Sequence, residues 1–246
     1  MRDMQVADGI HRLTRGVVNF YLVEDGAKLT LVDAGAPGDW ETFERAAGSL
    51  GRTLTDLDAV LLTHAHSDHT GFAERARTQA EAEVWIHGAD AETARTGVAP
   101  ENEKGFGSYL FRLEAYRTLF GLMRRKGLKI VPIHEVSMFG DGEILDVPGR
   151  PRIVHVPGHT DGSCAILLEP QHALITGDAL ATRNPLTGRT GPQIGPDGLN
   201  HDSAQALRSL DSLATLSVDL VLPGHGDPWT HGIAEAVRLA KAAGRS

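Results

Sequence analysis

The sequence predicts an α+β fold in which mixed β-sheets pack together and helices cover their outer faces. Hydrophobic residues make up 41% of the 246 residues, which is enough for a sizeable core under a solvated surface. Apolar runs at residues 17–23 and 29–33 are separated by a Glu-Asp-Gly turn, which predicts an antiparallel hairpin. Further along the chain strands alternate with helices, so both antiparallel and parallel pairing are expected.

The first half of the chain reads as short strands followed by helices. Residues 39–50 have apolar positions at helical spacing, and Asp39 is suited to cap that helix. The run DAVLL at 58–62 is typical of a short buried strand. The other elements expected here are a helix at 70–79, a strand at 83–87 and a helix at 89–95.

The second half begins with a loop at 97–105 and an aromatic-rich helical pattern at 106–125. A long loop rich in Gly and Pro follows at 184–198, a length that is often functional. The expected strands are 129–133, 137–139, 144–147, 153–156, 164–169, 173–176 and 219–222, and the expected helices are 203–216 and 231–243.

Charge and composition exclude several classes of protein. The formal net charge of −8 disfavours a nucleic-acid or anionic-membrane binder, because such surfaces need clustered Lys and Arg. The single cysteine, Cys164, excludes an intramolecular disulfide framework. No signal-peptide pattern and no run of 18 apolar residues is present. We therefore expect one domain over 1–246 with a helical insertion at about 97–128, in a cytoplasmic protein that binds a small molecule and forms a possible homodimer.

The most informative segment is His64-x-His66-x-Asp68-His69, which directly follows an expected strand. His and Asp are the ligands that zinc takes in proteins when no thiolate is present. His64 and His66 would share one face in a strand, whereas Asp68 and His69 can point elsewhere at the start of the next helix. This segment by itself could therefore supply ligands to two neighbouring metals.

Three later residues occupy comparable positions. His159, Asp178 and His225 each follow an apolar strand pattern, and each has a glycine directly before it. Glycine allows the chain to turn sharply and leaves space beside a metal site. The repetition of this arrangement along the chain favours one shared metal centre over scattered surface residues.

Together these motifs resemble the metallo-β-lactamase-fold hydrolases, and the glyoxalase-II-like branch in particular. The resemblance implies an αββα sandwich of two mixed sheets, with two divalent metal ions at one edge. Zn²⁺ is the expected metal, and Fe or Mn could take its place. By resemblance, the first ion is held by His64, His66 and His159, the second by Asp68, His69 and His225, and Asp178 bridges them.

The resemblance implies hydrolysis of an ester, thioester or lactone by a hydroxide that bridges the two metals. Asp68 is the candidate catalytic residue, because a free carboxylate oxygen could carry a proton. Asp178 stands where the β-lactamases with a thiolate ligand have Cys, which favours the thioesterase and lactonase branches. Two alternatives remain open: an enzyme like the mononuclear iron persulfide dioxygenases, and a non-catalytic metal-binding module.

Several residues around this motif have two interpretations. Asp33, Thr63 and Thr160 could support metal ligands, or could only bond to local backbone. The basic cluster Arg124-Arg125-Lys126, with Lys129, is expected at a solvated helix end, or could instead attract an anionic substrate such as a glutathione or coenzyme A thioester. Helix 106–126 could be a packing element or a lid over an apolar substrate pocket. In the lid interpretation the lining residues would be Phe106, Tyr109, Phe111 or Tyr116.

Overall fold

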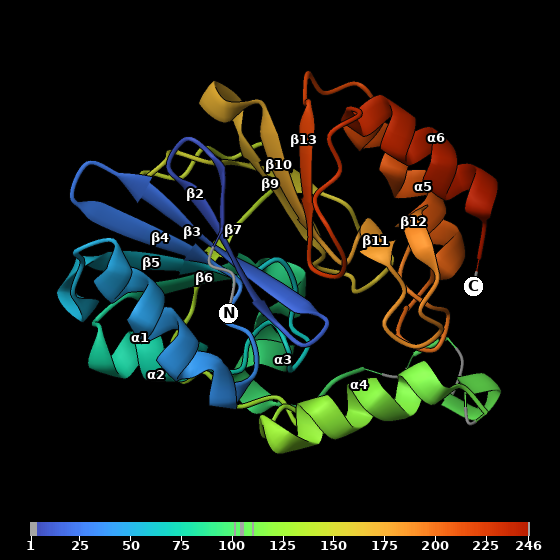
Figure 1. Cartoon of the computed structure of the whole chain (residues 1–246), viewed down its shortest axis with the longest axis horizontal. Helices are drawn as coiled ribbons and strands as arrows, with labels where there is room; N and C mark the ends of the chain where they lie inside the picture. The colour runs from blue at the N-terminus through green and yellow to red at the C-terminus, as the bar shows by residue number, and fades with distance from the viewer. Residues whose placement is uncertain (1–3, 101, 104–105, 110, 246) are drawn as a thin grey trace.

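The computed structural model describes residues 4–100, 102–103, 106–109 and 111–245. Two β-sheets lie face to face, and helices cover the outer side of each (Figure 1). Both sheets contain parallel and antiparallel pairs, so they are mixed. The predicted α+β class and the αββα sandwich are confirmed.

The first sheet has seven strands in chain order. Pairing is antiparallel from β1 to β4 and parallel from β4 to β7. Gly26, with φ at +58°, makes the tight turn of the predicted hairpin possible. The strands are β1 (Met4–Ala7), β2 (Ile10–Arg15), β3 (Val18–Asp25), β4 (Lys28–Val32), β5 (Leu57–Leu61), β6 (Glu83–His87) and β7 (Ser137–Phe139).

The second sheet has four strands in the order β13-β10-β9-β8. Its members are β8 (Arg152–His155), β9 (Cys164–Leu168), β10 (Ala173–Gly177) and β13 (Leu220–Pro223). A separate two-stranded sheet joins β11 (Ala181–Arg183) to β12 (Thr190–Gln193). The strand β12 therefore lies inside the segment 184–198, which the sequence predicted to be a loop.

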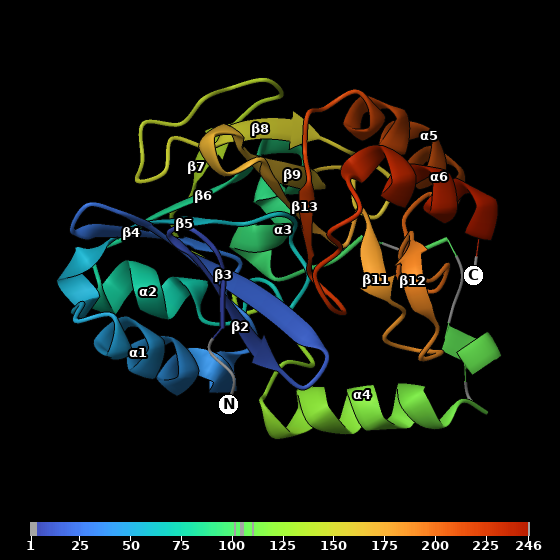
Figure 2. The same cartoon turned by 45° about the horizontal axis from the view of Figure 1, so that its top comes forward.

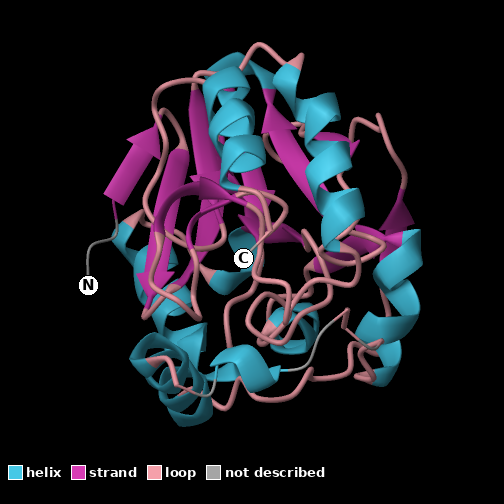
Figure 3. Ribbon diagram, turned by 90° about the vertical axis from the view of Figure 1, so that its right-hand side faces the viewer, coloured by secondary structure: helices cyan, strands magenta, loops and turns pink. Residues whose placement is uncertain are grey.

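Helices lie on both outer faces. The first sheet is covered by α1 (Trp40–Ser49), α2 (Ala73–Gln79) and α3 (Ala91–Thr96), and the second by α5 (Ser203–Ala214) and α6 (Ile233–Ala243). Viewed from the side of α5 and α6, these helices lie in front of the strands that they cover (Figure 3). The helix α4 (Leu113–Arg124) lies at the rim, apart from both sheets (Figure 2). Short 3₁₀ turns occur at Pro37–Asp39, Leu54–Asp56, Gly88–Asp90, Phe106–Tyr109 and Glu169–Gln171.

Strand alternation explains why the core divides into three layers. In β3, Phe20 and Leu22 face the layer under α1 and α2, whereas Tyr21 and Val23 face the layer between the sheets. A third layer lies between the second sheet and α5 and α6. Successive residues of a strand point to opposite faces, so a strand that is buried on both sides reads as a continuous apolar run.

Two predicted strands are wrong. Residues 129–133 are irregular, and of 144–147 only Ile144 forms an isolated bridge, to Arg152. Both segments bury apolar side chains, but apart from this bridge their backbones do not pair with a neighbouring strand. Hydrophobic periodicity indicates burial and does not show whether such pairing occurs. Conversely, the sequence does not predict β1 and β2. In β2 the polar residue Arg12 takes a buried position, which interrupts the apolar alternation.

The helix expected at 106–125 is shorter in the structure. A 3₁₀ turn covers Phe106–Tyr109, and α4 begins at Leu113. Between them, Arg112 has an extended backbone, with φ at −101° and ψ at 116°, which ends any continuous helical path. Within the described residues, no helix combines the length and the apolar character that crossing a bilayer requires.

The end of α4 is fixed by a buried ion pair, which corrects the expectation of a fully solvated basic cluster. Nη1 of Arg125 lies 2.7 Å from Oδ2 of Asp39, whose side chain is fully buried. The side chain of Arg125 is only 11% exposed, whereas Arg124 is exposed. This pair connects the rim helix to the start of α1.

Replacing Arg125 by Met is expected to lower the free energy of unfolding by about 3 kcal/mol, because the Asp39 charge would stay buried without its main partner. The matched change Arg124→Met removes an exposed cation and is expected to cost less than about 0.5 kcal/mol. Urea unfolding of both variants measures the difference. Equal stability of the two variants would show that the buried pair does not hold this region together.

Candidate metal centre

The topology places the predicted ligands at one edge of the sandwich. The strands β8, β10 and β13 run in the same direction, so their carboxyl ends lie together. His159, Asp178 and His225 follow these three strands, and the segment from His64 to His69 follows β5 of the other sheet. Backbone bonds join the sheets at this edge, such as Cys164 N–H to Thr63 O at 2.9 Å.

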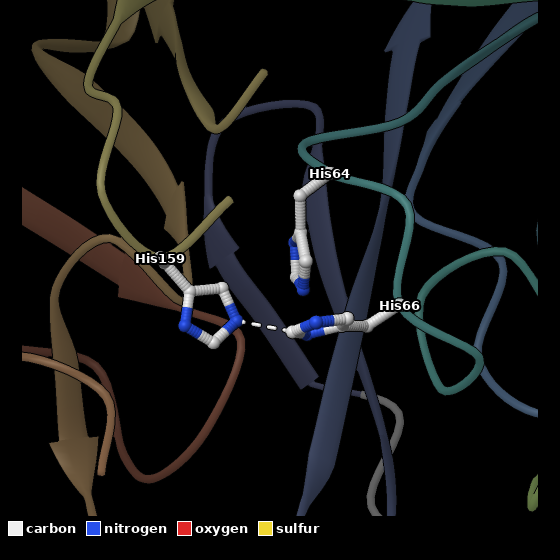
Figure 4. A group of neighbouring side chains, drawn as sticks. All are labelled: His64, His66 and His159. Atoms are coloured by element: carbon white, nitrogen blue, oxygen red, sulfur yellow. Dashed lines mark hydrogen bonds between the residues drawn. The ribbon is translucent and has the colours of Figure 1, made fainter. Parts of the chain in front are cut away.

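The first group of ligands consists of His64, His66 and His159, whose rings converge (Figure 4). Nε2 of His159 lies 3.0 Å from Nδ1 of His66. The His64 ring is 4.8 Å from that of His66 and 4.7 Å from that of His159, between centroids. Nitrogens bound about 2.0–2.1 Å from a tetrahedral zinc are roughly 3.3 Å apart, so this spacing suits a shared ion.

The second group consists of Asp68, His69 and His225. The carboxylate of Asp68 lies 4.0 Å from Nε2 of His69 and 3.7 Å from Nε2 of His225. Asp178 stands between the two groups, with Oδ1 3.4 Å from His69 Nε2 and Oδ2 3.5 Å from His159 Nε2 and 3.1 Å from His225 Nε2. The structure thus brings all seven predicted ligands together.

A close backbone approach makes room for this cluster. A Cβ atom at Gly224 would lie only 2.4 Å from Oδ1 of Asp178 and 2.8 Å from Cε1 of His69. Any side chain at this position would therefore displace a ligand. This explains the glycine directly before His225 in steric terms.

Unpartnered polar atoms show that the cluster fits metal ions. Nε2 of His64, Nε2 of His69 and Oδ1 of Asp178 are buried and have no hydrogen-bond partner among the described residues. A buried polar atom without a partner costs about 1–3 kcal/mol. Divalent ions accept both imidazole nitrogen and carboxylate oxygen, so the donors present match such ions in type and in number.

Burial and charge give most of these groups the protonation state that binds metal. Burial lowers the pKa of His64, His159 and His66, the last to about 3, so these imidazoles are neutral. For Asp178, burial alone would raise the pKa, but His225 and His69 outweigh it and hold the pKa well below its usual value. Asp68 has a lowered pKa because the same two histidines outweigh its burial.

Two histidines are shifted in the other direction. Burial would lower the pKa of His69, but Asp178 and Asp33 outweigh it and raise the pKa to about 10. The pKa of His225 is also raised, since Asp178 outweighs its burial. The raised pKa values of His69 and His225 favour their protonated forms, so a metal ion at these nitrogens would compete with protons.

Each of four histidines forms a hydrogen bond through Nδ1, which leaves its Nε2 facing the centre. They are His64, His69, His159 and His225. His69 Nδ1 donates to Oδ2 of Asp33 at 2.8 Å, and His225 Nδ1 donates to the carbonyl of Val17 at 2.7 Å. The Thr63 hydroxyl donates to Asp33 and accepts from His64 Nδ1 at 3.0 Å. Asp33 and Thr63 thus support ligands, as one of their two interpretations predicted.

Two supporting residues were missed by sequence reasoning. Oδ1 of Asn200 accepts from His159 Nδ1 at 2.8 Å. Buried Asp90 accepts from the backbone of Ala65 and from the hydroxyl of Thr160, and so joins the two ligand loops. Asp90 lies shortly after a strand and near a glycine, which is the same signal that marked Asp178, but Asn200 carries no such signal.

The side chains of two other histidines, His155 and His201, contact residues outside the two ligand groups, although the backbone N–H of His201 donates to the carbonyl of His159 at 3.0 Å. The ring of His155 stacks on that of His87 at 4.1 Å. Nδ1 of His201 lies 2.8 Å from a carboxylate oxygen of Asp161. Neither residue lines the cavity beside the metal centre.

A cavity of about 820 Å³ extends from the metal centre to α4. Among the aromatic residues considered for a lid, Tyr109 and Tyr116 line this cavity. Phe111 is 96% exposed and does not line it, and the side chain of Phe106 lies outside the described part of the structure. The helix α4 therefore forms one wall of the cavity.

An αββα sandwich with a buried His/Asp cluster at one sheet edge defines a class of metal-binding proteins. The model of the metallo-β-lactamase superfamily matches residues 13–225, so this chain belongs to that superfamily.

Named relatives agree with this assignment. The chain is 30% identical over 217 residues to the uncharacterized protein YobT of Bacillus subtilis (strain 168), covering 85% of this chain and 83% of the relative. It is 24% identical over 243 residues to the probable metallo-hydrolase YflN of the same organism, covering 92% of this chain and 87% of the relative. A metallo-beta-lactamase family protein from Thermus thermophilus superposes with a TM-score of 0.72 at 25% identity, over 97% of this chain and 80% of that one.

Replacing Asp33 by Asn is expected to weaken binding of one zinc ion about 10–100-fold, because His69 loses its anionic partner. Asn also tolerates the left-handed backbone of this residue, where φ is +62°. Zinc titration against a competing chelator measures both affinities. Asp161→Asn, at an exposed position, is the control and should change neither. Two unchanged affinities in Asp33→Asn would contradict the role given to Asp33.

Proposed function

We propose that this protein is a hydrolase that uses two divalent metal ions, with zinc preferred, to cleave an ester, thioester or lactone bond. The observation that carries the proposal is the pair of ligand groups that share Asp178 at the end of a cavity. Relatives that bear the name probable metallo-hydrolase support the same class of reaction.

Bound metal ions would supply a water of lowered pKa and would polarise the scissile carbonyl. The chain's own contribution is to hold the ligands and to manage protons and water. His66, Asp68, Asp178 and His225 line the inner end of the cavity, so a substrate carbonyl placed there meets the cluster directly. The walls beyond them are largely apolar.

Asp68 is the residue that we assign to proton transfer. Its side chain is 16% exposed, lines the cavity, and has a lowered pKa despite its burial. It is therefore a carboxylate at neutral pH and can accept a proton from the attacking water. The same oxygen can then deliver this proton to the leaving group.

The alternatives are less well supported. A single-iron site like that of the persulfide dioxygenases uses fewer metal ligands, which leaves the convergence of Asp68, His69 and His225 with the other ligands unexplained. A non-catalytic metal module needs no adjoining cavity, whereas a cavity of about 820 Å³ opens from this cluster.

Metal analysis followed by a substrate panel tests the proposal. We expect about two metal ions per chain, and hydrolysis of at least one class among esters, thioesters and lactones by the zinc-loaded protein. A single bound iron with oxygen consumption on glutathione persulfide would favour the dioxygenase alternative. Two bound metals without turnover of any class would contradict the proposed reaction.

Asp68→Asn is expected to reduce kcat at least about 100-fold, because the amide cannot accept the proton. The measurement uses a zinc concentration that saturates the variant, so that lost affinity is separated from lost proton transfer. Asp211→Asn, at an exposed position on α5, is the control and should retain full activity. A zinc-saturated Asp68→Asn variant with unchanged kcat would remove Asp68 from the mechanism.

A further inference from the structure

The cavity has two chemically different ends. Its inner end is made of metal-centre side chains, whereas the region beyond is lined largely by aliphatic and aromatic residues. The large aliphatic residues of this outer lining include Val98, Leu119, Leu122, Ile130, Leu186 and Leu199. A substrate that fills the cavity must therefore place a polar group at the metal centre and an apolar group under α4.

Few charged side chains line the cavity beyond the metal centre. Of the described lining residues outside the metal cluster, Lys129 is the one with a charged side chain, and it is exposed. A charged group on the substrate would lose hydration against the apolar side chains, and Lys129 is the one charged partner that the described outer lining offers it, which makes such placement costly over most of the wall. Most of this outer lining therefore suits an apolar part of a substrate better than a charged one.

The apolar wall is held in place by specific contacts. The Thr118 hydroxyl on α4 donates to the carbonyl of Pro185 at 2.6 Å, which ties the helix to the segment after β11. Leu122 lies four residues after Thr118 on the same side of the helix, and Leu119 is adjacent to that side. Leu186, which directly follows Pro185 and also lines the cavity, is only 5% exposed.

We propose that the substrate carries an uncharged alkyl or acyl chain of several carbons, which binds in the cavity beneath α4 while the scissile carbonyl lies at the metal centre. This inference rests on the proposed function and specifies its substrate class. A cavity of about 820 Å³ lies within the usual range for small-molecule sites and exceeds what an acetyl group occupies.

A chain-length series tests the inference. The zinc-loaded protein is assayed with methyl esters, S-methyl thioesters and γ-lactones that carry alkyl chains of two to eight carbons. We expect kcat/KM to rise up to about fourfold for each added CH₂ until the cavity is filled. We also expect octanoate to bind at least about tenfold more tightly than acetate in calorimetry, which is a readout independent of turnover.

Two matched variants on α4 locate the chain. Leu119 is 54% exposed and lines the cavity, whereas Met123 is 52% exposed and does not. Leu119→Asn is expected to reduce kcat/KM about tenfold for eight-carbon substrates, and less than about twofold for two-carbon substrates. Met123→Asn is expected to change neither. Val98→Asn, at a lining position that is 70% exposed, provides a second variant with little effect on folding.

The outcomes separate this inference from the proposed function. Hydrolysis that is independent of chain length, or an equal effect of Leu119→Asn and Met123→Asn, would overturn the apolar-chain inference and leave the hydrolase intact. Tight octanoate binding with no hydrolysis of any substrate would overturn the proposed function and keep the ligand preference. Equal binding of octanoate and acetate would overturn the inference whatever the activity.

Discussion

The carboxylate of Asp178, buried among imidazoles, is the interaction on which the rest of the site depends. Its oxygens lie 3.1–3.5 Å from ring nitrogens of His69, His159 and His225. His69 comes from the first sheet and the other two residues from the second, so one negative charge holds both halves of the cluster together. Its position directly after β10, in the middle of the second sheet, places it where both ligand groups can reach it.

This arrangement needs a rigid frame, because the cluster buries polar atoms that the described residues leave unpartnered. The sheets are joined close to the site: both Asn19 and Tyr21 of β3 donate to the carbonyl of Pro223, at 2.9 and 2.7 Å. Asp33 and Asn200 then fix the ring orientation of individual histidines. Ligands held in this way need little rearrangement when a metal binds.

The cavity adds a second constraint, because α4 is part of its wall and of no sheet-covering layer. The helix keeps several large apolar side chains half-exposed, among them Leu119 and Phe120. Its pattern alone predicted a helix, and the sequence left open whether that helix packs or covers a pocket. The structure shows that the helix lines the pocket. The buried ion pair of Arg125 with Asp39 and the hydrogen bond from Thr118 to the carbonyl of Pro185 hold α4 there.

The sequence alone determined the ligand types, the hairpin and most strands. These features depend on strand alternation, turn residues and the His64–His69 spacing, which involve only a few neighbouring residues. Tertiary structure decided the roles of Asp90 and Asn200, whose partners lie 25 and 41 residues away. It also decided that residues 129–133 are irregular. Pairing depends on which backbone lies alongside, and a single segment carries no information about that neighbour.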